Sequence, residues 1–196
     1  MFIDYAGIML LNAVAGYFLL AYYVFSGLDD PNQTKWAPGF LMTGFLALLF
    51  GVLMTVTWPI PGPYMKAFGE MSALLGVIFL GAGVAMAKGW SLATVACYAF
   101  FAGWAAVIIG VRVIQLKLTL TPAISGVAFI LSGAAGVFAA PTLAWMRSNR
   151  AWRTLAALVI VAAAVLWAFI VYPEYWVHME RFMKWVPLLA REAGQP

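Results

Sequence analysis

Charged residues, histidine and cysteine are all scarce in this sequence. Of 196 residues, 11 are basic and 7 are acidic, which together make 9% of the chain, whereas about a quarter of a soluble domain is charged. This shortage excludes a soluble single domain and a disordered chain. The net charge of +4 is too small and too scattered for a nucleic-acid-binding surface, so no nucleic-acid partner is predicted.

Residue types that bind metals or carry out catalysis are also lacking. One cysteine, Cys97, cannot close a disulfide within the chain, and one histidine, His178, cannot anchor a multi-histidine metal site. The apolar segments contain no Ser–His–Asp set, and the sequence has no phosphate-binding loop. We therefore predict that the protein is not an enzyme, and that it holds no metal and no cofactor.

Long apolar runs are what the sequence does contain. Hydrophobic residues make up 65% of the chain, and the mean hydropathy is +0.96. A helix of about 20 apolar residues crosses the hydrocarbon of a bilayer, and continuous rather than alternating runs favour helices over barrel strands. The sequence predicts an all-α integral membrane protein with six transmembrane helices, over residues 5–25, 39–58, 68–87, 91–112, 122–145 and 152–172.

Tryptophan and proline positions agree with these spans. Seven of the nine tryptophans lie at or beyond predicted helix ends, the depth in a membrane that amphipathic rings prefer. Trp58 precedes three prolines, which must end the second helix. Pro141 should kink or end the fifth helix, and Ser148-Asn149 can cap the sixth.

The chain divides into a bundle and a tail. Residues 1–173 are predicted to form the six-helix bundle, and residues 174–196 an amphipathic tail that lies in the membrane interface or, alternatively, a short solvated helix. Five basic residues in the short loops of one side against three on the other favour an orientation with both termini outside. The three basic residues of the tail favour the opposite orientation.

Glycines recur at seven-residue spacing in four of the predicted helices. Seven residues are two helical turns, so each set lies on one face and permits close helix packing, within a subunit or between subunits. The second and fourth helices match at an offset of 59 residues, and the third and fifth at an offset of 50, which favours a threefold repeat of helical hairpins. Chance similarity between Gly- and Ala-rich helices is the alternative. The packing glycines are Gly44, Gly51, Gly69, Gly76, Gly83, Gly103, Gly110, Gly126 and Gly133.

Polar and aromatic side chains within the spans are candidates for the lining of a pore or ligand site. Glu70 either caps the third helix or lies at a pore mouth, and Asn12 either hydrogen-bonds across helices or faces a wet cavity. Tyr98, Trp104 and Trp167 are the remaining lining candidates, although Tyr98 is equally suited to helix packing.

Two family resemblances follow from short segments. Lys35-Trp36-Ala37-Pro38-Gly39-Phe40-Leu41, Trp58-Pro59-Ile60-Pro61-Gly62 and Phe68-Gly69-Glu70 together resemble an uncharacterised prokaryotic family of six-helix membrane proteins. This resemblance implies a multi-pass protein of a prokaryotic inner membrane. Asn12-Ala13-Val14-Ala15-Gly16, Phe68-Gly69, Leu74-Leu75 and the spacing from Gly89 to Tyr98, which Phe101-Ala102 extends, resemble the acid-gated urea channel and amide transporter family.

The second resemblance implies a specific architecture and activity. It implies three hairpin repeats, a pore through each protomer, a hexameric ring and passage of small neutral amides. Two features depart from that family: no histidine lies in a loop between spans, and the last span has no carboxylate. Proton gating and urea selectivity are therefore not implied with the fold.

The function that these observations favour is a membrane channel or facilitator for a small uncharged, urea- or amide-like solute. A bundle with so few charges within its spans is poorly suited to stabilise an ion. The alternative is a non-transporting subunit or scaffold that binds lipid or quinone in a larger complex. The predicted partners are membrane lipids, the solute and further copies of the chain.

Overall fold

The computed structural model describes residues 5–183 and 185, and the described residues are built from helices and connecting loops. Three short segments adjoin the longer helices: π-helical turns at Tyr23–Gly27 and Met65–Glu70, and a 3₁₀ turn at Gln33–Trp36. The α-helices are α1 (Ala6–Tyr22), α2 (Ala37–Thr57), α3 (Met71–Lys88), α4 (Ala93–Gln115), α5 (Pro122–Val137), α6 (Ala139–Ala144) and α7 (Arg150–Phe182).

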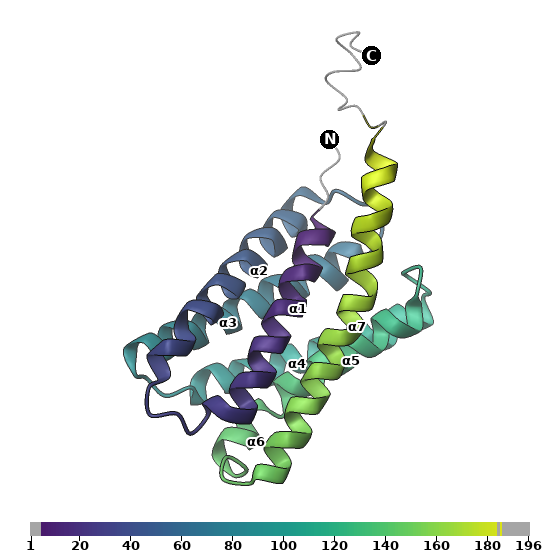
Figure 1. The fold of residues 1–196 in the computed structure, drawn as a ribbon. Coiled ribbons are helices and arrows are strands. Elements are labelled where there is room, and N and C mark those ends of the chain that lie inside the picture. Colours follow the sequence, from purple (N-terminus) through teal and green to yellow (C-terminus); the bar gives the residue numbers. More distant parts are fainter. Residues whose placement is uncertain (1–4, 184, 186–196) are drawn as a thin grey trace.

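Six helical segments are long and apolar enough to cross a membrane, which confirms the predicted six spans. They run up and down, so the connections lie alternately at two ends of the bundle (Figure 1). We call the end that carries residues 28–32, 89–92 and 145–149 the arginine end, because Arg147 and Arg153 lie there. The other end, with residues 58–64 and 116–121, is the terminal end.

Proline and capping residues set several of the helix ends. Trp58 adopts a left-handed conformation with φ of 44° directly before Pro59, which ends α2. Pro141 has no N–H for the Val137 carbonyl, and α5 ends at Val137 before the chain continues as α6. Asn149 Oδ1 accepts a hydrogen bond from the Trp152 N–H at 3.0 Å and caps α7. The effects predicted for Pro141 and Asn149 are therefore present.

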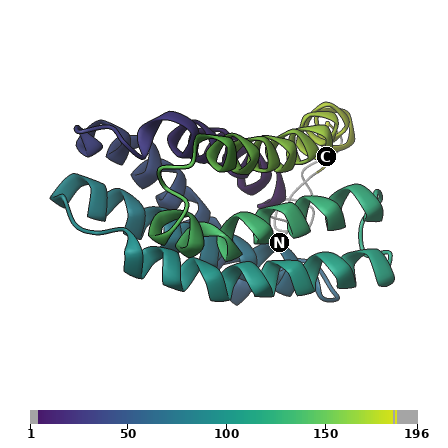
Figure 2. The same ribbon diagram turned by 90° about the horizontal axis from the view of Figure 1, so that it is seen from below.

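The six spans close into a ring. The most extensive contacts join α2 to α3, α4 to α5, and α1 to α7, while α1–α2, α3–α4 and α5–α7 also touch. Figures 1 and 2 show α1 and α7 side by side on one side of the molecule, opposite α4 and α5. This alternation of close and looser neighbours is the pattern that three consecutive hairpins produce around a pseudo-threefold axis.

The glycine stripes lie at the close contacts within one chain. A Cβ added at Gly44 would stand 2.5 Å from the Leu80 nitrogen, and one at Gly103 would stand 2.5 Å from the Gly133 oxygen. Each of the nine glycines predicted to pack has an atom of a neighbouring helix within 3.0 Å of such a Cβ. Their absent side chains therefore allow α2 and α3, and likewise α4 and α5, to approach backbone to backbone.

The contacts also fix the register of the repeat. Gly44 meets Gly76 and Gly51 meets Gly69. Gly103 meets Gly133 and Gly110 meets Gly126. The second and fourth spans correspond at the predicted offset of 59, but the third and fifth correspond at 57 rather than 50. A shift of seven residues keeps the same helix face, so the glycine pattern alone cannot separate the two registers.

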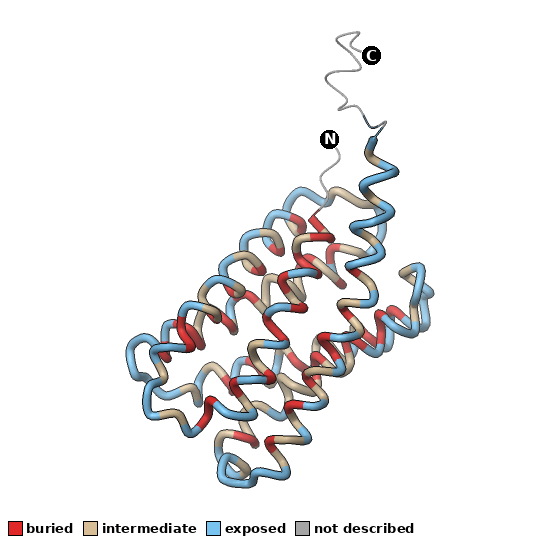
Figure 3. Tube along the Cα trace, viewed as in Figure 1, coloured by how far each residue is buried: buried red, intermediate tan, exposed pale blue. Residues whose placement is uncertain are grey.

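Burial follows the ring. Buried residues lie mainly where helices face one another, and exposed residues along their outer sides (Figure 3). The exposed surface along the spans is apolar and includes Phe45, Phe101 and Phe169. Such a surface fits contact with lipid. The helix does not end at residue 173, where the predicted tail begins, because α7 continues through Pro173 to Phe182. This last part of α7 extends beyond the neighbouring helices at the terminal end (Figure 1). The rest of that tail, at 184 and 186–196, lies outside the described residues.

Candidate functional site

A central cavity of about 490 Å³ lies inside the ring, between α1, α3, α4, α5 and α7. Its lining on the first span extends from Ala6 to Val24, which is about 27 Å at 1.5 Å per residue. The cavity therefore follows most of the length of the bundle. Among its lining residues, all within the described part of the chain, none carries a charge.

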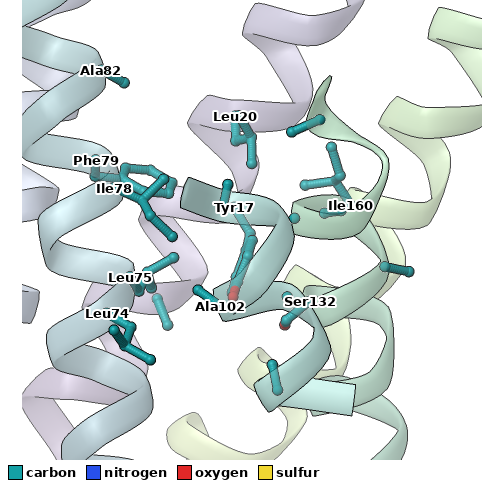
Figure 4. A pocket seen from close by; sticks show the side chains of 18 of the residues that line it. Tyr17, Leu20, Leu74, Leu75, Ile78, Phe79, Ala82, Ala102, Ser132 and Ile160 are labelled. Carbon is teal, nitrogen blue, oxygen red and sulfur yellow. The ribbon is translucent and has the colours of Figure 1, made fainter. Parts of the chain in front are cut away.

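Small and aliphatic side chains form most of the wall. The fourth span contributes Ala99, Ala102 and Ala106, whose short side chains leave the space open. The third span contributes Leu74, Leu75, Ile78 and Phe79, which face Tyr17 across the cavity (Figure 4). A solute in this space therefore meets mainly carbon atoms.

One cluster of polar atoms interrupts the apolar wall. Trp167 Nε1 donates a hydrogen bond to Ser132 Oγ at 3.1 Å, and that hydroxyl donates to the Ala128 carbonyl at 2.7 Å. The Trp167 ring stands edge-on to Phe129, with 4.8 Å between the ring centroids. Figure 4 shows the Tyr17 hydroxyl near the Ser132 hydroxyl, so α1, α5 and α7 bring polar groups to one place.

Of the five predicted lining residues, Trp167 lines the central cavity and is buried. Asn12 is also buried, but its Nδ2 donates to the Thr43 carbonyl of α2 at 2.8 Å and the residue does not line the cavity. Its position thus matches the cross-helix alternative. Tyr98 and Trp104 lie on the outer face of α4 and are about half exposed.

Glu70 also lies away from the cavity. Its Oε1 accepts a hydrogen bond from Lys66 Nζ at 2.6 Å, one helical turn earlier, at the partly exposed terminal end. Its side chain makes no capping hydrogen bond with α3. The structure therefore places Trp167 with Tyr17 and Ser132, and leaves the other four candidates apart. Tyr17 and Ser132 were not among the residues predicted from sequence. The one sequence signal that could have pointed to this cluster is that Ser132 directly precedes the packing glycine Gly133.

A charged cluster holds the arginine end together. Arg153 is buried, and it donates from Nε to the Val24 carbonyl at 2.9 Å and from Nη2 to the Phe25 carbonyl at 2.6 Å. Its Nη1 pairs with the Asp29 carboxylate, which Arg147 also approaches at 3.5 Å. A guanidinium thus satisfies carbonyls at the end of the first span, where helices leave acceptors unpaired.

The loop that follows carries a second ion pair. The Asp30 carboxylate is paired with Lys35. The hydrogen bond from Lys35 holds the pKa of Asp30 below its ordinary value, and the backbone N–H of Asn32 acts in the same direction. Asp30 therefore stays ionised under ordinary conditions and belongs to the loop rather than to the cavity.

A second cavity of about 380 Å³, which we call the vestibule, lies at the arginine end. Its wall is more polar than that of the central cavity and includes Gln33, Ser91 and Arg147. The Tyr23 hydroxyl donates to Gln33 Oε1 at 2.8 Å in this wall. A more polar cavity thus adjoins the apolar central cavity.

Comparison with known proteins identifies the family and the fold. A family described as “Protein of unknown function (DUF981)” matches residues 1–181. The chain belongs to this family. A search of curated proteins gave no match for the DUF981 chain. Among solved structures, the Helicobacter pylori urea channel in its closed state is similar, with a TM-score of 0.68 and 15% identity over 92% of this chain and 99% of that chain.

The family match and the structural likeness confirm the two predicted resemblances. At 15% identity the structural likeness shows that the DUF981 chain and the urea channel share a fold. The sequence departures noted above remain in the three-dimensional arrangement, because the described lining of the central cavity in the DUF981 chain includes no carboxylate and no histidine. In this chain the shared fold encloses a cavity lined by uncharged residues.

Proposed function

We propose that this protein is a membrane channel or facilitator for a small uncharged solute of urea or amide type. The observation that carries the proposal is the long, uncharged central cavity inside a ring of six apolar spans. The shared fold with a urea channel supports it. The polar vestibule at one end supports it as well, because it provides a place where a hydrated solute can enter.

The lining favours neutral over charged solutes. An ion that enters an apolar space without a counter-charge loses hydration worth several kcal/mol or more. A neutral amide loses far less, and the hydroxyls of Tyr17 and Ser132 offer hydrogen-bond partners for part of what it loses, while the Trp167 N–H holds the Ser132 hydroxyl in place. The cluster therefore selects by hydrogen bonding where the rest of the wall selects by size.

Flux measurements on proteoliposomes test the proposal. Stopped-flow light scattering with urea, formamide, acetamide and glycerol should show permeation above that of empty liposomes for at least one solute. Ala156→Phe puts a large ring on the cavity side of α7 and should lower that flux. Ala162→Phe makes the same change on the exposed side of α7 and should not. Absence of flux for every solute from folded protein would contradict the proposal.

The nearly all-carbon wall specifically favours one other occupant. A quinone ring or a lipid acyl chain also fits an elongated apolar cavity, and a non-transporting subunit would use it to bind such a ligand. Mass spectrometry of the purified protein separates the two functions. A tightly retained quinone or lipid, lost in Ala156→Phe and kept in Ala162→Phe, together with absent flux, would favour the binding function.

The proposal includes partners around the bundle. Lipids cover the exposed apolar surface of the spans, and further copies of the chain assemble beside one another in the membrane. The glycine stripes already pack against neighbouring helices of the same chain. Contacts between copies would therefore use the outer faces of the helices instead. The mass of the purified protein in detergent, measured against that of one chain, tests the assembly.

A further inference from the structure

The central cavity and the vestibule meet at a shared wall. Five residues line both spaces, and they come from the end of the first span, from α3, from the α3–α4 connection and from α6. These residues, which we call the partition, are Tyr23, Leu28, Met86, Leu92 and Leu143. The route between the polar entrance and the apolar interior therefore crosses this layer.

The partition is tightly packed. Tyr23, Leu28 and Met86 are each less than 5% exposed. They belong to one hydrophobic cluster, against which Leu92 and Leu143 also pack. A layer of touching apolar side chains leaves no room for water and blocks a hydrated solute. Passage therefore needs at least one of these side chains to move.

Leu28 is the partition residue whose backbone carbonyl accepts a hydrogen bond from an arginine. It lies just after the π-helical turn, where its N–H donates to the Tyr23 carbonyl at 3.1 Å. Arg147 Nη2 donates to the Leu28 carbonyl. The next residue, Asp29, pairs with both Arg147 and Arg153. Arg147, from the connection between α6 and α7, thus holds the Leu28 carbonyl, and Arg153 of the neighbouring α7 holds the next residue through the Asp29 carboxylate.

We propose that Leu28 controls passage between the vestibule and the central cavity, and that Arg147 and Arg153 position it by holding the Leu28 carbonyl and the Asp29 carboxylate. The inference rests on the proposed channel function. Leu28 limits solute size because its side chain fills the boundary. The arginines act through Leu28 and touch no solute in this role.

Thiol labelling tests the partition without any transport. In a Cys97→Ala background, Ala85→Cys places a thiol on the vestibule wall and Ala82→Cys places one on the central cavity wall, one turn away on α3. Both positions are buried alanines, so they form a matched pair. A hydrophilic maleimide should label the Ala85→Cys protein rapidly and the Ala82→Cys protein slowly.

Changes at Leu28 should move one of these two rates. Leu28→Ala should speed labelling of Ala82→Cys several-fold and leave that of Ala85→Cys unchanged, whereas Leu28→Met, which conserves volume, should alter neither. If Leu28→Ala does not fold, Leu28→Val provides a smaller opening of the same kind. An unchanged rate for Ala82→Cys in the folded variant would overturn the proposal.

The positioning arginines have their own matched test. Arg147→Met removes the donor to the Leu28 carbonyl and should speed labelling of Ala82→Cys although Leu28 itself is intact. Arg150→Met changes an exposed arginine nearby at the same end and should not. Equal rates for both variants would show that Arg147 does not position Leu28.

Flux measured on the same variants separates the two proposals. Faster labelling together with faster glycerol flux in Leu28→Ala supports both the partition and the channel. Faster labelling with no flux of any solute supports the partition and rejects the channel. Flux through the unmodified protein with labelling unaffected by Leu28→Ala supports the channel and rejects the partition.

Discussion

Gly103→Ala should destabilise the protein although it adds one methyl group in the middle of a helix. The new Cβ would stand 2.5 Å from the Gly133 oxygen and 2.7 Å from the Val137 nitrogen, both on α5. These are backbone atoms, so no side-chain rotation relieves the contact. Ordinary contact begins near 3.4 Å, and α4 and α5 must therefore separate by about 0.9 Å at this point.

The size of the effect follows from two opposing contributions. Overpacking of this kind lowers the free energy of unfolding by roughly 1–3 kcal/mol. Replacing glycine by alanine in a helix raises it by up to about 1 kcal/mol. We expect a net loss on the order of 1–2 kcal/mol, because the separated helices also lose contacts along the rest of the α4–α5 pair.

Gly81→Ala provides the matched control. Gly81 lies in the middle of α3, and a Cβ there would meet Val95 Cγ2 at 3.5 Å, an ordinary contact. Unfolding in detergent, followed by circular dichroism on heating, should show a lower midpoint for Gly103→Ala and an unchanged or higher one for Gly81→Ala. Equal midpoints for the two variants would refute the assignment of Gly103 to a tight helix contact.

Three further predictions concern polar residues. Asn12→Leu should cost about 0.5–2 kcal/mol of stability through loss of the hydrogen bond to Thr43, and should leave flux nearly unchanged in proteoliposomes. Glu70→Gln should change stability by less than about 1 kcal/mol, because its ion pair is partly exposed, and flux at different pH values should match that of the unmodified protein. Arg153→Met should cost roughly 1–3 kcal/mol, measured as a fall in the unfolding midpoint, because it leaves two partly buried carbonyls without their donor and removes a partner of the Asp29 carboxylate.

The spans were predictable because lipid acts as a uniform solvent. Any segment of about 20 apolar residues is driven into the bilayer as a helix whatever its neighbours are. The prolines after Trp58 end a helix, and the glycines of α2–α5 leave a helix face without side chains. Both effects follow from the local sequence, so they could be predicted from it. Neither kind of signal depends on which helices become neighbours.

Cavity lining depends on those neighbours and could not be predicted. On α4 the aromatic residues Tyr98 and Trp104 face outward, where the bilayer accepts them at low cost. Ala99 and Ala102 face inward, because small side chains are what leave a cavity open. A prediction that the cavity is lined by polar and aromatic residues therefore picks the outer face of α4. Ser132 resembles many packing serines until α7 brings Trp167 to it.

The role of the tail remains a prediction. Deletion of residues 174–196 should leave the six spans inserted, because the apolar run of every predicted span precedes that segment. The continuous helix through Pro173 means that the deletion also removes the end of α7. Loss of membrane insertion in the truncated protein would show that this end belongs to the bundle.

The pairing of α1 with α7 has a consequence for how the protein is made. The first span leaves the ribosome early, yet its most extensive neighbour is the last one to emerge. At about 5–20 residues per second, the wait is on the order of 10 s. During that interval the side of the cavity that α7 will cover is exposed to lipid. The Val24 and Phe25 carbonyls do not yet have Arg153 as a hydrogen-bond donor. Biogenesis therefore ends with the displacement of lipid by the final helix, and a chain that stops before residue 150 encloses nothing.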